Sequence, residues 1–194
     1  TWAQAAEYAD SVGADVINSS LGYAQFDDAT TRHRYVDLDG ERTLISHTAS
    51  MLAQKGIVLV CSAGNSGRDP WKKITPPGDA RDVLTVGAVD AKGLNTAFSS
   101  IGPSQDGRVK PDIMARGGQA RIFNAAGVNG TANGTSFASP IACGMVACLW
   151  QALPGKTAKE IISIVQQSAD RYQTPDNIFG YGIPNFWKAY QNAR

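Results

Sequence analysis

Apolar and polar positions change period several times along the chain, and the changes predict alternating helices and strands. Helical spacing of apolar residues predicts helices over 1–12, 43–55, 136–152 and 157–168, and a last helix from Pro184. Continuous apolar runs predict strands over 15–18, 57–62 and 83–89. Apolar strands separated by helices are typical of a parallel sheet buried on both faces. We therefore expect a three-layer α/β fold, with a parallel sheet flanked by helices.

The segments between these elements read as loops. Residues 23–42 are polar and are expected to form a long loop. Residues 66–82 are rich in proline, glycine and charge, which favours an excursion over the surface. Residues 90–134 are rich in glycine and offer one short strand near 121–124.

Composition narrows the function classes. The chain has 194 residues and is 43% hydrophobic, which suits one globular domain or most of one. A net charge of +1 gives no electrostatic footprint for nucleic acid or an anionic membrane. No apolar run approaches the 18 or more residues of a membrane-spanning helix.

No metal site or disulfide framework is predicted. The three cysteines are Cys61 in an apolar strand, and Cys143 and Cys148 five positions apart on one helix. An odd count without a C-x-x-C pair favours buried free thiols. The segment 37–40, Asp-Leu-Asp-Gly, resembles a cation loop only in composition and is better read as an acidic turn.

The sequence Asn-Gly-Thr-Ser-Phe-Ala-Ser-Pro at 133–140 leads into a long apolar helix. Gly134 permits a tight backbone turn, and Pro140 suits the first helical turn. Ser136 would then lie at the helix N-terminus, where free N–H groups favour a developing negative charge. Residues in this arrangement suit a nucleophile, although an ordinary N-cap serine has the same local pattern.

The segment 134–140 resembles the nucleophile signature of the subtilisin-like serine proteases, the subtilases. Further segments resemble the family in the same order along the chain: 16–22, 58–65, 83–89, 98–102, 110–113 and 180–185. The resemblance implies a seven-stranded parallel sheet with the nucleophile helix packed behind it. It also implies that the family's first three strands lie together on one side of this chain's part of the sheet.

The family's catalytic aspartate and histidine contexts, Asp-[Thr/Ser]-Gly and His-Gly-Thr-His, do not occur in the chain. Neither histidine fits: His33 lies in a polar stretch that reads as a surface loop, and His47 lies in a helical pattern. In the family both catalytic contexts precede the first matching segment. We therefore interpret residues 1–194 as a partial catalytic domain, incomplete on its N-terminal side. The strand at 15–18 would become a free sheet edge, which predicts that the chain alone tends to dimerise or aggregate.

The resemblance assigns roles to individual residues. Ser136 is the expected nucleophile and Asn65 the expected oxyanion donor, although Gly-Asn-Ser-Gly also suits a simple turn. The expected substrate-binding residues lie in two segments that end strands, namely Ser20, Leu21, Gly22, Ala63 and Gly64. Their alternative role is to terminate those strands. Arg116 stands where the family usually has proline, so the resemblance does not predict the geometry of that loop.

The sequence is thus identified as part of a serine endopeptidase that forms an acyl-enzyme at Ser136 and acts on polypeptides. Without two triad members the chain alone is expected to be almost inactive. The alternative is a non-catalytic, peptide-binding pseudoprotease. A serine esterase is disfavoured because Gly-x-Ser-x-Gly would need glycine where Ala138 stands. The chemistry requires no cofactor, the family often carries structural calcium whose ligands cannot be assigned here, and kinship implies a secreted or periplasmic parent.

Overall fold

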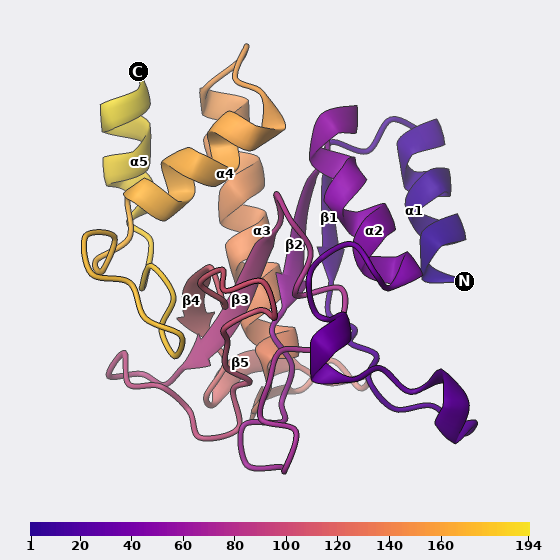
Figure 1. The fold of residues 1–194 in the computed structure, drawn as a ribbon. Coiled ribbons are helices and arrows are strands. Elements are labelled where there is room, and N and C mark those ends of the chain that lie inside the picture. The colour runs from indigo at the N-terminus through magenta and orange to yellow at the C-terminus, as the bar shows by residue number, and fades with distance from the viewer.

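The computed structural model describes residues 1–194 and contains a four-stranded parallel sheet in the order β1-β2-β3-β4 (Figure 1). The strands are β1 (Val16–Ser19), β2 (Val58–Ser62), β3 (Leu84–Val89) and β4 (Ile113–Arg116). Val16 pairs with Val58, Val60 with Leu84 and Val86 with Ile113. The predicted α/β class is confirmed, and β1 is an edge strand as expected.

Helices cover both faces of the sheet. α3 (Thr135–Ala152) contacts all four strands, and the adjoining core also contains residues of α4 (Ala158–Gln167) and α5 (Phe186–Ala193). A second core joins the other face of β2 to α1 (Trp2–Ser11) and α2 (Leu44–Leu52). In β2 alternate residues serve the two cores, with Val58 and Val60 in one, and Leu59 and Cys61 in the other. The continuous apolar run in the sequence follows from this double burial.

Local signals in the sequence account for several helix ends. The hydroxyl of Thr43 accepts the N–H of Ser46 at the start of α2, and Thr157 forms a capping box with Glu160 at the start of α4. α2 continues into a 3-10 turn, η3 (Ala53–Lys55), which ends at Gly56 with a φ of 86°. The left-handed conformation explains the glycine there.

The surface excursion predicted over 66–82 is wrong for its second half, because residues 74–80 are buried. The carboxylate of Asp79 is fully buried and accepts the N–H of Gly40 at 2.8 Å and the hydroxyl of Ser46 at 2.6 Å. Burial raises the pKa of Asp79 above its ordinary value. The charge of Asp79 favoured a position at the surface when the sequence was read alone. Inside the protein, its carboxylate instead joins the segment 74–80 to α2.

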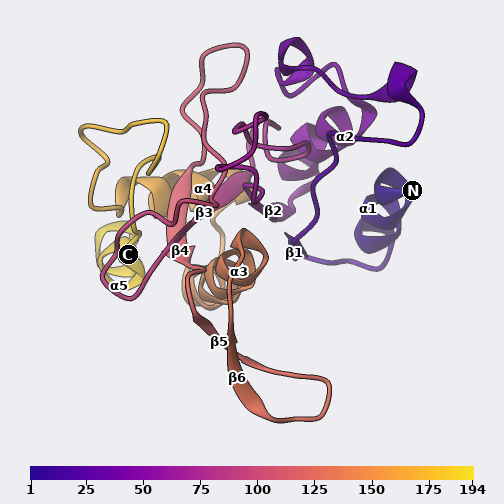
Figure 2. The same ribbon diagram turned by 90° about the horizontal axis from the view of Figure 1, so that it is seen from below.

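Strand β4 was not predicted from the sequence. It has only four residues and ends at Arg116, immediately before Gly117 and Gly118, so its apolar signal is short. The strand expected near 121–124 is one arm of an antiparallel hairpin, β5 (Ala120–Phe123) and β6 (Asn129–Ala132), which projects from the body of the protein (Figure 2). The last helix begins at Phe186, after an Asn185 N-cap, rather than at Pro184.

The remaining predictions have mixed outcomes. The loop over 23–42 contains two 3-10 turns, η1 (Ala29–Thr31) and η2 (Tyr35–Asp37), and no strand or longer helix. All three cysteines are free, but only Cys61 is fully buried; Cys143 is half-buried and Cys148 is exposed, so the prediction of buried thiols is wrong for Cys148. None of the helices combines the length and apolar character that crossing a membrane requires.

Candidate active site

Three chain segments meet at one edge of the sheet. Residues 20–22 follow β1, residues 63–65 follow β2, and both strands are parallel, so the two segments leave the sheet at its carboxyl edge. The first turn of α3 reaches the same edge, because Ser20 and Ser136 are joined by hydrogen bonds. Crevices beyond the carboxyl ends of parallel strands are the usual ligand sites of α/β sheets. The structure therefore brings the segments selected from the sequence into one neighbourhood.

The start of α3 leaves Ser136 accessible to a reactant. Gly134 occupies the N-cap position with a φ of 157°, and no side chain caps this end of the helix. Ser136 lies in the first turn and is half-buried, with its hydroxyl 3.4 Å from the carbonyl oxygen of Ser20. The N–H of Ser136 has no acceptor four residues earlier within the helix, as is general for first-turn groups. One residue thus offers a hydroxyl and an N–H at the positive end of the helix dipole.

The side chain of Asn65 is held in one orientation by Thr135. Its Oδ1 accepts the backbone N–H of Thr135 at 2.9 Å and the Thr135 hydroxyl at 3.0 Å. The Nδ2 group is left on the other side, 3.7 Å from where a Cβ on Gly134 would lie. The amide Nδ2 therefore lies beside Gly134 at the beginning of α3, two residues before Ser136.

Thr135 itself was not singled out from the sequence. Its side chain is fully buried, and its Oγ1 also accepts the N–H of Gly64 at 3.2 Å. A threonine between a glycine and a serine carries no sign of this role when the sequence is read alone. The only hint was its place inside the Gly-Thr-Ser motif.

A second set of hydrogen bonds ties α3 to the end of β1. The hydroxyl of Ser20 donates to the carbonyl oxygen of Ser136 at 3.0 Å and accepts from the Asn18 side-chain amide at 3.1 Å. The Oδ1 of Asn18 in turn accepts the hydroxyl of Ser139, in the same helix, at 2.7 Å. These bonds fix the position of Ser136 relative to the sheet. Neither Asn18 nor Ser139 was assigned this role from the sequence.

The remaining predicted substrate-binding residues lie on two sides of one side chain. Leu21 is 52% exposed, whereas Ala63 is fully buried. Gly22 and Gly64 both approach the hydroxyl of Thr75, and a Cβ on Gly64 would lie 3.0 Å from it. The N–H of Thr75 donates to the carbonyl of Ala63 at 3.2 Å. The two segments after β1 and β2 thus face each other across Thr75.

Neither histidine belongs to this neighbourhood. His47 is exposed and its Nδ1 lies 2.8 Å from Oε2 of Glu41. The ring of His33 packs edge-on against Phe26, with ring centroids 5.2 Å apart. The hydroxyl of Ser136 has a backbone carbonyl rather than an imidazole as its neighbour, so residues 1–194 contain no histidine placed as its base.

No three side chains among histidine, cysteine, aspartate and glutamate cluster closely enough to hold a metal ion. The carboxylate of Asp37 accepts the N–H of Arg34, and that of Asp39 accepts the N–H groups of Glu41 and Arg42. Both carboxylates therefore stabilise local turns.

Arg116, which departs from the family pattern, stabilises the loop after β4. Its Nε donates to the carbonyl of Gly118 at 2.6 Å and its Nη2 to that of Gln119 at 3.2 Å. The carbonyl of the intervening Gly117 accepts the N–H of Gly134 at 2.9 Å. Arginine thus fixes this loop with side-chain donors, beside the start of α3.

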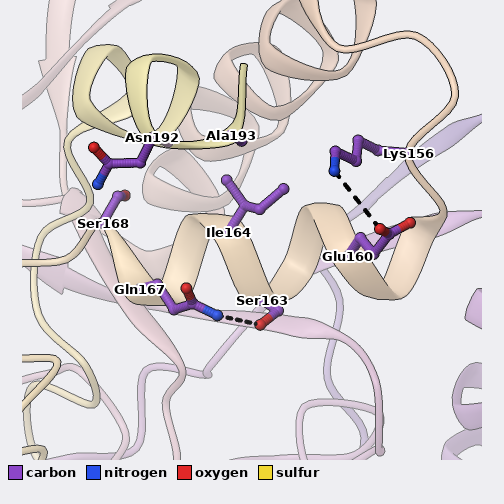
Figure 3. A pocket seen from close by; sticks show the side chains of 9 residues that line it. Lys156, Glu160, Ser163, Ile164, Gln167, Ser168, Asn192 and Ala193 are labelled. Carbon is purple, nitrogen blue, oxygen red and sulfur yellow. Dashed lines mark hydrogen bonds and ion pairs between the residues drawn. The ribbon is translucent and has the colours of Figure 1, made fainter.

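A separate cavity of about 290 Å³ lies between α4 and α5 (Figure 3). Among its lining residues, Lys156 lies 3.8 Å from Glu160, and Gln167 donates to the hydroxyl of Ser163 at 2.7 Å. None of the predicted site residues lines this cavity. The candidate active site is therefore the sheet edge where Ser136 lies, not this cavity.

Comparison with curated sequences supports a protease relationship. The serine protease AprX of Bacillus subtilis (strain 168) is 35% identical over 154 residues, which cover 67% of this chain and 34% of AprX. The thermophilic serine proteinase of Bacillus sp. (strain AK1) is 30% identical over 187 residues, covering 96% of this chain and 40% of that protein. The chain thus spans well under half the length of these relatives.

Solved structures give the same result. The self-cleaved protease domain of PatA superposes with a TM-score of 0.76 at 27% identity, covering 98% of this chain and 66% of that one. The Peptidase_S8 model, which describes the subtilase family, matches residues 1–182. Together with the fold, these matches show that the chain belongs to the subtilase family of serine proteases.

Proposed function

We propose that this chain is the nucleophile-bearing part of a serine endopeptidase. The observation that carries the proposal is the fixed arrangement of Ser136 at the start of α3 beside the Asn65 amide, whose oxygen is held by Thr135. Acyl transfer needs a nucleophile, a base and donors for an oxyanion. Ser136 and Asn65 supply the first and third of these.

In the proposed reaction the Oγ of Ser136 attacks the carbonyl carbon of a peptide bond while its proton passes to a base. Negative charge develops on the former carbonyl oxygen, which accepts hydrogen bonds from Nδ2 of Asn65 and the N–H of Ser136. The carbon–nitrogen bond then breaks, and the leaving amine takes the proton from the base. Water, activated by the same base, hydrolyses the resulting ester and restores Ser136.

An extended polypeptide substrate would lie between residues 20–22 and 63–64, which leave the sheet side by side. Main-chain hydrogen bonds to such segments give affinity, and pockets for side chains give selectivity. The base and its orienting aspartate are proposed to come from residues of the parent protein outside this chain. Removing the base from a serine protease costs about 10⁶ in turnover, so the chain alone is proposed to be almost inactive.

The test uses the full-length parent protein and a fluorophosphonate probe that labels activated serines. Labelling of the parent and its loss in the Ser136→Ala variant are expected. The control is Ser163→Ala, because Ser163 lies on α4 beside a cavity that none of the predicted site residues lines, so this variant should keep its labelling. Absence of labelling in a folded parent would favour the pseudoprotease. A secreted or periplasmic location of the parent stays a prediction from kinship.

A further inference from the structure

Arg116 ends β4 near the start of α3, and both of its side-chain hydrogen bonds go to backbone oxygens. Its Nε donates to the carbonyl of Gly118 at 2.6 Å and its Nη2 to the carbonyl of Gln119 at 3.2 Å. Two N–H groups of one rigid, planar guanidinium therefore hold two successive peptide units. Arg116 is half-buried and Gly118 is buried, so this turn lies partly inside the protein.

Gln119 has a left-handed backbone conformation, with a φ of 48°, which residues with a Cβ rarely adopt. Such a conformation persists only where neighbouring groups hold it. Here the carbonyl of Gln119 is held by Arg116, and its N–H donates to Oδ1 of Asn133 at 2.7 Å. Because Gln119 is exposed, burial of its side chain contributes little. The two hydrogen bonds therefore fix its backbone.

The same turn contacts the residues directly before the proposed nucleophile. Asn133, which accepts the N–H of Gln119, precedes Gly134, the N-cap residue of α3. The N–H of Gly134 donates to the carbonyl of Gly117 at 2.9 Å. Two hydrogen bonds from consecutive residues thus join the start of α3 to residues 117–119. Since Ser136 follows two residues after Gly134, a shift of this turn would displace its hydroxyl.

We propose that Arg116 is a positioning residue for Ser136, because it holds Gln119 in the left-handed conformation on which the start of α3 depends. The proposal rests on the endopeptidase function above and adds a residue to the machinery of that site. Arg116 acts through the backbone of residues 117–119 and 133–134, not on the substrate. The subtilases usually have proline at this position, so the role belongs to this chain and not to the machinery common to the family.

The experiment compares the full-length parent with its Arg116→Met variant, which keeps an unbranched side chain but has no donor. Circular dichroism checks the fold, and the measured quantities are kcat and KM on one peptide and the rate constant of fluorophosphonate labelling. Because a displaced nucleophile slows the chemical step, kcat and the labelling rate are expected to fall together by about 10- to 100-fold, with KM nearly unchanged. Arg121→Met is the matched control, since Arg121 is exposed on β5.

A second substitution separates positioning from a general loss of stability. Glycine adopts the left-handed conformation without the cost that a Cβ imposes, so Gln119→Gly removes the need for the guanidinium. The double variant, Arg116→Met with Gln119→Gly, is expected to recover kcat to within about threefold of the wild type. If Arg116→Met does not fold, Arg116→Lys gives the same comparison, because a single ammonium lacks the two spaced N–H groups that hold both carbonyls.

Either of two results would overturn the proposal: a folded Arg116→Met variant with the kcat of the wild type, or a double variant no more active than Arg116→Met alone. Absent labelling of the folded wild-type parent would instead reject the endopeptidase function. The role of Arg116 is then measured by hydrogen–deuterium exchange of the peptide that contains Gly134. Exchange of that amide is expected to be at least about tenfold faster in Arg116→Met and to return to the wild-type rate in the double variant. An unchanged rate would reject the positioning role independently.

Discussion

The substitution Thr135→Val in the full-length parent tests how Asn65, the proposed oxyanion donor, is held. Valine keeps the volume of threonine but removes the hydroxyl, which donates to Oδ1 of Asn65 at 3.0 Å and accepts the N–H of Gly64 at 3.2 Å. The backbone N–H of residue 135 still donates to Asn65 at 2.9 Å. One of the two constraints on the Asn65 amide is therefore lost, and one backbone donor loses its acceptor.

The expected magnitudes follow from these contacts. A lost neutral hydrogen bond costs about 1 kcal/mol, and a backbone N–H left without a partner in a partly buried site adds about 1–2 kcal/mol. The free energy of unfolding should thus fall by about 2–3 kcal/mol. Removing an oxyanion donor outright costs about 10²–10³ in kcat. With one of two constraints retained, we expect a fall in kcat of about tenfold, with KM nearly unchanged.

Urea unfolding followed by circular dichroism measures the stability, and peptide hydrolysis measures kcat and KM. Thr135→Ser is the matched control, because it loses only a methyl group and keeps the hydroxyl. It should retain most of the activity, whereas the valine variant should not. If both variants turn over substrate equally well, the orientation of Asn65 does not depend on Thr135 and the argument fails.

Three further predictions concern other parts of the chain. Lys110→Met removes the buried ammonium 2.6 Å from Asp112 and should lower the free energy of unfolding by about 3–5 kcal/mol, measured by urea titration. The exposed Lys55→Met is the control, and a smaller loss for Lys110→Met than for this control would contradict the prediction. Burial raises the pKa of Cys61 from 9.0 to about 12, so the unfolded chain loses the thiol proton first. Stability should therefore fall as the pH rises from 9 toward 12, and Cys61→Ala should flatten that dependence in thermal melts. The free edge of β1 should make the chain alone self-associate, and a concentration-independent monomer in sedimentation velocity would refute this.

Periodicity predicted the elements whose burial is uniform. β2 and β3 are buried along their whole length, so their apolar runs are unbroken in the sequence. β4 could not be found this way, because its last two residues, Ala115 and Arg116, are only half-buried and the strand has four residues. Pairing with β3 rather than composition makes that segment a strand.

The residues of the candidate site also fall into those that local sequence predicts and those that only the fold reveals. Ser136 and Asn65 were found because each lies in a local motif that joins glycine to a strand or helix end. Thr135, Asn18 and Ser139 were not found, since their roles depend on partners 70 residues away for Thr135 and 121 residues away for Ser139 with Asn18. Local sequence carries the chemistry of a reactive group, whereas the fold supplies what orients it.

Two buried polar residues show why local sequence does not predict every part of the structure. Asp79 and Thr75 both lie in a segment whose proline, glycine and charge are typical of a surface loop. Inside the protein Asp79 is tolerable because Gly40 and Ser46 supply donors to its carboxylate. Thr75 has no such partner for its hydroxyl, and it lies between the two glycines beside the proposed nucleophile. Whether such a group is satisfied depends on residues brought to it from elsewhere in the chain, so the composition of the segment alone predicts neither its burial nor its partners.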